Sequence, residues 1–440
     1  MEVIKQTFRQ NDIVRVLKIR PFFFLMLSEF FSQIAFNMQH FVIIFIIYEI
    51  TKSNTAVSGV ILSFIIPAII FSFIAGVYVD RWNKKKVLLF TNLIRGVLIL
   101  LFLFSTTNIA LMYVLTFLIA ISTQFFLPAE APMIPLLVEK KFLVSANAVF
   151  AVGIFSTVFI GYIFSGPALI FLGRTNVFIF LAVLFFISGI FIELISYKKK
   201  KLEDNEIEIV KSIKTSSFIS EIKEVLLFIR KAREVFNALL IVAFSQTIIF
   251  TVAVLGPGYV ATILDTQVEN LSWIILAPCA FGLIVGALIV GSIAKKINNR
   301  LSITIGFILS GVVLAFLPMG SKVASQGIVQ AINAYLPHVL VINIMHIIVV
   351  LTFLLGLSNA LIFVPANATL QTKTNEELRG RIYGFLNAFT AVVSFLPVAM
   401  AGSLADIIGI GSVLTGVGIL IFTIGIIRFF SSGFVFFEKK

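Results

Sequence analysis

Long apolar segments alternate with short polar segments along the whole chain of 440 residues. A helix rises about 1.5 Å per residue, so roughly 20 apolar residues are needed to cross about 30 Å of hydrocarbon. Twelve segments are apolar over about this length, and each predicts a membrane-spanning helix: 22–48, 56–79, 87–105, 109–127, 146–172, 176–196, 236–263, 271–294, 301–318, 338–364, 382–404 and 412–430. The pattern therefore predicts an all-α polytopic membrane protein.

Composition agrees with this prediction and excludes soluble classes of protein. Hydrophobic residues make up 59% of the chain and charged residues only 12%, a balance that a soluble globular domain of this size does not have. The net charge of +13 does not indicate nucleic-acid binding, because the cations lie between apolar runs and not on one soluble surface. We therefore expect the lipid bilayer as a partner, and no nucleic acid.

The positions of lysine and arginine predict the orientation of the chain. If both termini are cytoplasmic, 29 of the 34 cations fall in cytoplasmic segments, and the outer loops hold only Lys52, Arg174 and Lys322. An excess of cations is typical of cytoplasmic loops. The sequence therefore predicts a multi-pass protein of the plasma membrane with both termini in the cytoplasm.

One long polar stretch divides the predicted spans into two groups of six. We predict an N-terminal six-helix bundle over 1–196, a cytoplasmic linker over 197–235 and a C-terminal six-helix bundle over 236–440. Within the linker, apolar residues from Phe218 to Ile229 recur at helical spacing. This spacing indicates either a helix in the membrane interface or a solvated linker helix.

Two motifs recur in both halves of the chain. The turn at 76–86 has an echo at 291–300, where Lys295 replaces Asp80. Pro128-Ala129 has an echo at Pro365-Ala366, and we expect each proline to end its helix because proline lacks a backbone donor. Parallel halves of this kind predict two pseudo-symmetric bundles with a substrate site between them near the middle of the membrane.

At the first of these turns the chain resembles the major facilitator superfamily. The residues that match its loop signature are Gly76, Asp80, Arg81, Lys84 and Lys85. The resemblance extends over nearly the whole chain, and the segments around Pro128 and Asn147 are similar to the branch that contains macrolide efflux proteins and the enterobactin exporter. It implies a secondary active transporter that exports amphipathic small molecules, macrolide-like drugs or siderophore-like compounds, by alternating access, with protons as the coupling ion.

The resemblance also implies a gate at the first turn. Asp80 would dock on the start of the eleventh helix, around 380–383, when the transporter faces outward. Arg81 then needs an acidic partner, and we choose Glu130. The alternative is that the cations only fix topology, but topology requires neither Gly76 nor Asp80.

Ionisable residues inside the spans are few, and each is costly unless it faces a cavity or a partner. Glu29, Gln33 and His40 fall on one face of the first predicted helix, which we expect to line the central cavity. Arg95 lies at a similar depth on the third helix and can pair with Glu29. A buried Glu29 that takes up and releases protons would couple transport; a static Glu29–Arg95 ion pair is the alternative.

The fifth predicted helix carries Gly161, Gly166 and Pro167. They resemble in part the glycine-proline signature that exporters of the superfamily place on this helix. The alternative is that the glycines only allow close helix packing.

Two other functions stay open: a lipid or lysophospholipid carrier of the same fold, and a non-transport membrane scaffold or receptor. An enzyme is not expected, because the sequence has no phosphate-binding Gly-Lys-Ser/Thr loop, metal-ligand cluster or nucleophile-base set. We accordingly expect no cofactor and no metal, and a monomer that binds a small-molecule substrate.

Overall fold

The computed structural model describes residues 12–105, 108–196, 218–293, 298–320, 333, 343–374 and 376–431. These residues are almost entirely helical, and no strand occurs among them. The helices are α2 (Asp12–Leu17), α3 (Arg20–Thr51), α4 (Asn54–Arg81), α5 (Lys84–Leu101), α6 (Ile109–Glu130), α7 (Met133–Leu137), α8 (Leu143–Glu193), α10 (Phe218–Lys231), α11 (Arg233–Gly258), α12 (Ala277–Ile293), α13 (Asn299–Phe316), α15 (Ile344–Lys373), α16 (Glu376–Ile408) and α17 (Ile410–Ser431).

Eleven helices in the described part of the chain are long and apolar enough to cross a membrane. One of them, α8, has 51 residues and a break at Gly173, where φ is 74° and ψ is 173°. Glycine adopts this positive φ without the steric cost that a Cβ brings. Because Gly173 lies between the predicted spans 146–172 and 176–196, α8 supplies two spans, and the total agrees with the twelve predicted. The predicted fold class is confirmed.

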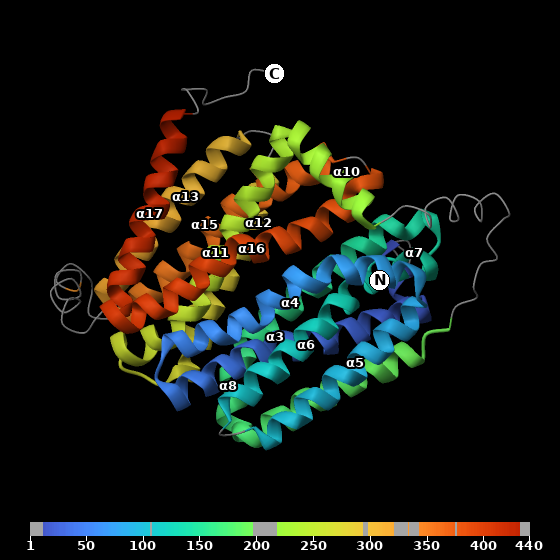
Figure 1. Ribbon diagram of the computed structural model, residues 1–440, viewed down its shortest axis with the longest axis horizontal. Helices are drawn as coiled ribbons and strands as arrows, with labels where there is room; N and C mark the ends of the chain where they lie inside the picture. Colours follow the sequence, from blue (N-terminus) through green and yellow to red (C-terminus); the bar gives the residue numbers. More distant parts are fainter. Residues whose placement is uncertain are drawn as a thin grey trace, which may run out of the picture.

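The helices form two groups, coloured blue to green and yellow to red in Figure 1. In the first half, α3 packs along α8, and α5 packs against α6 and α8. In the second half, α12 packs on α15, and α13 packs on α15 and α17. The main contact between the halves joins α4 to α16. These two helices therefore form the boundary at which the halves can move against each other.

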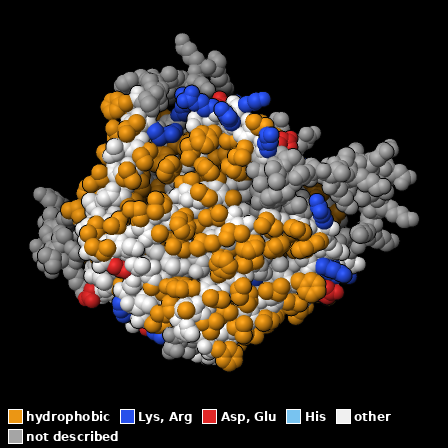
Figure 2. All heavy atoms as spheres, in the orientation of Figure 1, with side chains coloured by type: hydrophobic (Ala, Val, Ile, Leu, Met, Phe, Trp, Pro, Cys, Tyr) orange, Lys and Arg blue, Asp and Glu red, His pale blue; other side chains and the backbone are white. Residues whose placement is uncertain are grey.

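An apolar band covers the face of the molecule shown in Figure 2, and lysines and arginines gather at its upper and right margins. Many large apolar side chains of the described residues are exposed, among them Phe90, Phe171 and Ile407. Such a surface is stable in lipid and not in water. We call the end with the loop at 81–86 the basic end, and the opposite end, where α4 begins and α16 ends, the contact end.

The recurring asparagines begin the third helix of each half. The Asn83 side chain accepts a hydrogen bond from the Lys86 backbone N–H at 3.3 Å, and the Asn298 side chain accepts one from the Arg300 N–H at 2.9 Å. Both asparagines have extended backbone. Each is an N-cap, which supplies an acceptor to a helix end that would otherwise lack one. The duplicated turn thus has a duplicated structural role.

Pro128 and Pro365 do not end their helices, so that prediction was wrong. Pro128 lies inside α6, and α15 continues from Pro365 to Lys373. Pro365 cannot donate to the carbonyl of Leu361, but the Ser302 hydroxyl on α13 donates to this oxygen at 3.1 Å. A side chain from a neighbouring helix therefore supplies the hydrogen bond that the proline removes, which lets a spanning helix continue.

The helix expected within the linker is present as α10. Val225 and Ile229 are buried on the face toward α11 and α16, whereas Leu226 and Leu227 are exposed. Glu224 pairs with Arg381 of α16 at 2.7 Å. These contacts attach α10 to the second half of the chain. Its location in the membrane interface stays a prediction, and residues 197–217 lie outside the described residues.

Candidate transport gates and buried polar site

At the contact end, Asp406 near the end of α16 caps the first turn of α4 in the other half. Its carboxylate accepts hydrogen bonds from the backbone N–H groups of Asn54 at 2.8 Å and Thr55 at 2.9 Å. It also accepts from the side chains of Ser53, Asn54 and Thr55 at 2.6, 2.9 and 2.7 Å. The first N–H groups of a helix have no partner within the helix and carry partial positive charge. One carboxylate therefore holds the two halves together at this end.

A second contact at the same end joins α8 to a π-helical turn, η5 (Ser272–Leu276), that precedes α12. The Gly166 N–H donates to the Ser272 hydroxyl at 2.9 Å, and the Ser165 hydroxyl lies 3.1 Å from it. A Cβ at Gly166 would overlap the carbonyl oxygen of Glu269. Glycine is thus required for this approach of the halves.

The two predicted glycines of α8 have different surroundings. Gly161 packs inside the first half, against Asn37 and the Ile34 carbonyl of α3. Gly166 instead lies at the contact with the second half, and the next residue, Pro167, is buried. Close packing therefore accounts for Gly161, while Gly166 belongs to the contact between the halves.

At the basic end, the boundary helices have open surroundings. Gly76 on α4 and Gly384 on α16 have no atom within 4 Å of the position that a Cβ would occupy. Near the contact end, in contrast, a Cβ on Gly402 of α16 would overlap Asn54 and Ser58 of α4. In this conformation α4 and α16 are therefore packed together at the contact end, and are open around Gly76 and Gly384.

Arg81 and Glu130 of the predicted gate form no ion pair in this conformation. Arg81 is exposed, whereas Glu130 is buried and its Oε1 has no hydrogen-bond partner. Lys85 pairs with Glu193 of its own half, with Nζ 3.5 Å from the carboxylate and 2.7 Å from the backbone oxygen. The Asp80 side chain lies outside the described residues. An Arg81–Glu130 pair therefore stays a prediction for the opposite conformation.

Glu29 lies buried inside the first half and is only 1% exposed. Neither of its carboxylate oxygens has a hydrogen-bond partner. The flanking residues on α3 do have partners: Ser28 bonds Ser188 of α8 at 2.7 Å, and the Ser32 hydroxyl donates to Asn92 of α5 at 2.9 Å. A buried carboxylate without donors is costly when charged, and protonation removes that cost.

Arg95 is also 1% exposed, but it forms no ion pair with Glu29. Its guanidinium donates to the side chain of Asn92 at 2.9 Å and to the Thr91 carbonyl at 3.3 Å. The guanidinium carbon also lies 4.2 Å from the ring centre of Phe126 and 5.0 Å from that of Phe185. Stacking and hydrogen bonds thus hold the cation in place of the predicted direct pair.

The remaining residues of the predicted stripe on α3 are partly exposed. Gln33, Phe36 and His40 are accessible in part, in contrast with Glu29. His40 donates its Nδ1–H to the Phe36 carbonyl at 2.7 Å, and its ring stacks on Phe64 of α4 with ring centres 3.7 Å apart. His40 is therefore held within the first half. The cavity-lining role of Gln33 and His40 stays a prediction.

Sequence reasoning missed Asp406 as a gate residue and placed it only near a helix end. A local signal was present: Ser53-Asn54-Thr55 is typical of a helix start, which attracts a carboxylate. That Asp406 supplies this carboxylate depends on how the halves dock. No cluster of three or more His, Cys, Asp or Glu that could hold a metal occurs among the described residues.

An all-helical membrane architecture in which two groups of spans meet at one end is that of a membrane transporter. A family model described as Major Facilitator Superfamily matches residues 25–396. The chain belongs to the major facilitator superfamily. It is a carrier and not an enzyme.

Two relatives from Bacillus subtilis (strain 168) match most of the chain. An uncharacterised MFS-type transporter, YfiS, is 23% identical over 388 residues, covering 86% of this chain and 85% of YfiS. A second, YkuC, is 22% identical over 431 residues, covering 94% of this chain and 93% of YkuC. Both relatives carry the family name without a substrate.

Solved structures of transporters share the fold. The POT family transporter PepTSo has a TM-score of 0.68 at 14% identity, covering 94% of this chain and 97% of that one. The nucleoside transporter NupG also has a TM-score of 0.68, at 10% identity, covering 93% of this chain and 99% of that one. At such identities the likeness shows the fold alone.

Proposed function

We propose that this protein is a secondary active exporter of amphipathic small molecules that works by alternating access in the plasma membrane. The observation that carries the proposal is the packing of α4 against α16 at the contact end, by way of Asp406, while the basic end is open around Gly76 and Gly384. The halves are packed together at the contact end and are open around two glycines at the other end, which carries a second gate motif. Such an arrangement suits a carrier that closes one end at a time.

The distribution of cations supports the orientation of the carrier. The basic end carries Arg81, Lys84, Lys85 and Lys86, the cations of α10, and Arg300 at the start of α13. An excess of cations favours the cytoplasmic side. The conformation described here is then inward-facing, with both termini in the cytoplasm, and Asp406 closes the outer gate of a monomeric carrier.

The substrate class follows from the small amount of buried charge. Among the described residues, the buried acidic and basic side chains are Glu29, Arg95 and Glu130. A substrate with several charges would lack counter-charges in the interior, and desolvating it would be costly. A binding site lined by apolar and aromatic side chains favours the binding of amphipathic compounds with little net charge. Macrolide-like or siderophore-like compounds, as in the branch that the sequence resembles, fit this description.

Glu29 is the residue we assign to proton coupling. It is buried beside an organised polar cluster, and neither carboxylate oxygen makes a hydrogen bond, although the Gln33 side chain lies close enough to act on it. Arg95 lies near enough to act on Glu29 electrostatically, and its guanidinium is already held by Asn92, Phe126 and Phe185. A carboxyl group in such a position can change its protonation state without breaking an ion pair, as coupling of substrate exit to proton entry requires.

The test is a susceptibility panel in a bacterial host that lacks its own efflux pumps. The wild-type protein should raise the inhibitory concentration of amphipathic compounds severalfold, and an uncoupler should abolish the effect. A Gly166→Val variant, which blocks the contact between the halves, serves as the inactive control. Greater uptake of the compounds in cells that carry the wild type would overturn export. Protection that survives the uncoupler would overturn proton coupling, and vesicles that move only lysophospholipid would favour a lipid carrier.

A further inference from the structure

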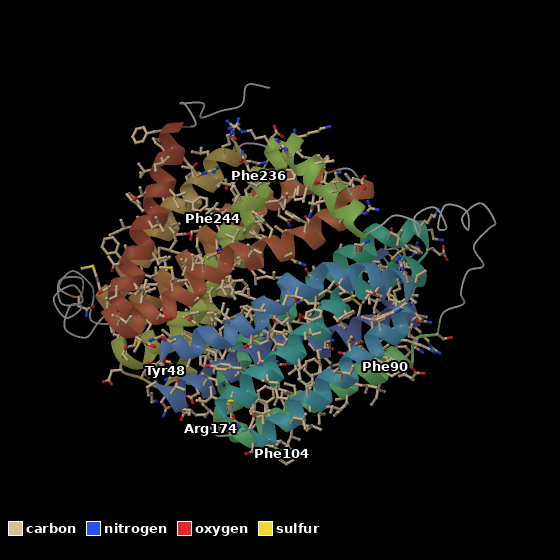
Figure 3. All side chains as sticks on the ribbon, in the orientation of Figure 1. Tyr48, Phe90, Phe104, Arg174, Phe236 and Phe244 are labelled. Atoms are coloured by element: carbon tan, nitrogen blue, oxygen red, sulfur yellow. The ribbon has the colours of Figure 1, made fainter. Side chains whose placement is uncertain are left out.

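A groove of about 840 Å³ lies on the outside of the first half, away from the boundary with the second half. The end of α4 and the lengths of α5 and α6 form its walls. Phe90 on α5 lines it and is 57% exposed, and Figure 3 shows Phe90 at the outer edge of this group of helices. The groove is thus accessible from the lipid and is separate from the proposed transport path.

The groove is lined mainly by apolar side chains along α5 and α6. Phe90, Ile94 and Leu98 recur every four residues along α5, and Leu118 faces them from α6. From Lys86 to Leu98 the helix rises about 18 Å at roughly 1.5 Å per residue. One leaflet of the hydrocarbon core is about 15 Å deep. The length of the groove therefore suits a single acyl chain that lies along the membrane normal.

The polar atoms in the floor of the groove already have partners. The Thr91 hydroxyl donates to the Val87 carbonyl at 2.8 Å, and the Ser122 hydroxyl donates to the Thr91 carbonyl at 3.3 Å. These groups therefore require no hydrogen bond from a ligand. An apolar occupant leaves no polar group unsatisfied there.

Two cations stand at the basic end of the groove. Arg81 and Lys86 both line it and are exposed, and within the described part of the chain neither forms an ion pair. The neighbouring Lys85 differs, because it pairs with Glu193. The charge on this end of the groove is therefore available to an anion from outside the protein.

Trp82 places these cations at the level of lipid headgroups. Its ring stacks on Phe125 of α6 with centres 6.0 Å apart and planes 15° apart, and it is 49% exposed. Tryptophan is enriched where hydrocarbon meets water, because its ring is apolar and its N–H is polar. Arg81 and Lys86 flank this position on either side in the sequence.

We propose that the groove binds one anionic phospholipid, with its phosphate between Arg81 and Lys86 and one acyl chain along Phe90, Ile94 and Leu98. Among the described residues these two cations have no acidic partner, and they favour a lipid with net negative charge over a zwitterionic lipid, whose ammonium group they would repel. The site lies directly after Asp80, at the turn assigned to the basic-end gate. A bound lipid therefore holds the loop that the gate motif occupies.

The experiment uses the two tryptophans of the chain, Trp82 and Trp273. A Trp273→Phe protein, in which Trp82 is the only tryptophan, is reconstituted in phosphatidylcholine vesicles. Phosphatidylglycerol or phosphatidylcholine, brominated near the carboxyl end of the acyl chains, is then titrated in, and quenching of Trp82 is measured. Brominated phosphatidylglycerol should quench at a mole fraction at least about tenfold lower than brominated phosphatidylcholine, as expected for two cations near an anionic headgroup.

Charge variants in the same background identify the site. Arg81→Gln and Lys86→Gln should each reduce the preference for phosphatidylglycerol severalfold, and the double variant should remove it. Arg300→Gln, an exposed cation of the duplicated turn in the other half, should leave the preference unchanged. A Trp82→Phe protein, which keeps Trp273, should show no preference. Equal quenching of Trp82 by both lipids, or an unchanged preference in either single variant, would overturn the proposal.

Discussion

The carboxylate of Asp406 on α16 accepts the backbone N–H of Asn54 on α4 at 2.8 Å, so one half of the transporter caps a helix of the other. The gate motif places Asp80 at the other end of α4, where the resemblance implies docking on the start of α16. These two helices thus carry two carboxylates: Asp406 of α16 at the contact end and Asp80 of α4 at the basic end. Asp406 holds the halves together at the contact end in the present conformation, and we assign Asp80 to the gate at the basic end in the opposite one.

Asp406→Asn should weaken the outer gate and increase the population that faces outward. The amide of asparagine would place an N–H donor against the N–H of Thr55 or the hydroxyl of Ser53, which now donate to a carboxylate. Loss of charge-assisted hydrogen bonds at an exposed position is expected to cost about 1–2 kcal/mol, or a shift of about tenfold in the population.

The shift can be measured with a thiol reporter. In a Cys279→Ser background, a Gln33→Cys variant is labelled from outside the cell with a membrane-impermeant maleimide. Asp406→Asn should raise the labelling rate about tenfold. Glu49→Gln breaks an ion pair with Arg174 at the same end but within one half, so it should leave labelling unchanged. Figure 3 shows Arg174 and the nearby Tyr48 at this end of the first half.

Gly166→Ala should also increase the population that faces outward, here because of a steric clash. The added Cβ would overlap the Glu269 carbonyl, so α8 could not approach the second half as it does now. We expect faster labelling of Gln33→Cys from outside and a transport rate reduced by at least about tenfold. Gly416→Ala on α17 is the matched control, because no atom lies within 4 Å of its Cβ position. A Gly166→Ala protein with wild-type transport would contradict the role of this contact.

The membrane-spanning helices could be predicted from the sequence because each one depends only on the apolar residues within its own segment. Apolar length predicted the span-length helices of the described residues, and the boundary at 172–176 coincides with the break at Gly173 in α8. The proline prediction failed because it considered one helix alone. The hydrogen bond from Ser302 to the Leu361 carbonyl comes from another helix, which no pattern around Pro365 reveals.

The candidate site was predicted only in part, for the same reason. The spacing of Glu29, Gln33 and His40 predicted that they share one face of α3. In the structure, however, Glu29 is buried inside its own half, while Gln33 is partly exposed. The similar depth of Glu29 and Arg95 suggested an ion pair, yet two phenylalanine rings and Asn92 hold the guanidinium. Asp406 became a gate residue only once the docking of the two halves was known.

Glu29→Gln should separate coupling from substrate movement. Glutamine is similar in shape to the protonated carboxyl group but cannot release a proton, so a pH gradient should no longer drive accumulation in everted vesicles. Exchange of labelled for unlabelled substrate without a gradient should continue at a rate within about threefold of wild type. Glu193→Gln, at an exposed ion pair with Lys85, is the control. Unchanged gradient-driven transport by Glu29→Gln would show that Glu29 is not the coupling residue.

Asp80→Asn should shift the conformational equilibrium in the direction opposite to Asp406→Asn. If Asp80 caps α16 at the inner gate when the carrier faces outward, its loss destabilises only that state. Labelling of Gln33→Cys from outside should then fall several-fold, whereas Asp406→Asn raises it. Insertion into the membrane should be unchanged, because the cations that set the topology remain.

Two further variants test whether Asp80 and Asp406 act at opposite ends. In the Asp80→Asn/Asp406→Asn protein both gates are weakened, so the labelling rate should return toward that of wild type while the net transport rate stays low. Lys295→Gln alters the second copy of the turn, which has no carboxylate to dock, and should change labelling little. If Asp80→Asn raised labelling from outside, or if Lys295→Gln lowered it as strongly as Asp80→Asn, the assignment of one carboxylate to each gate would be wrong.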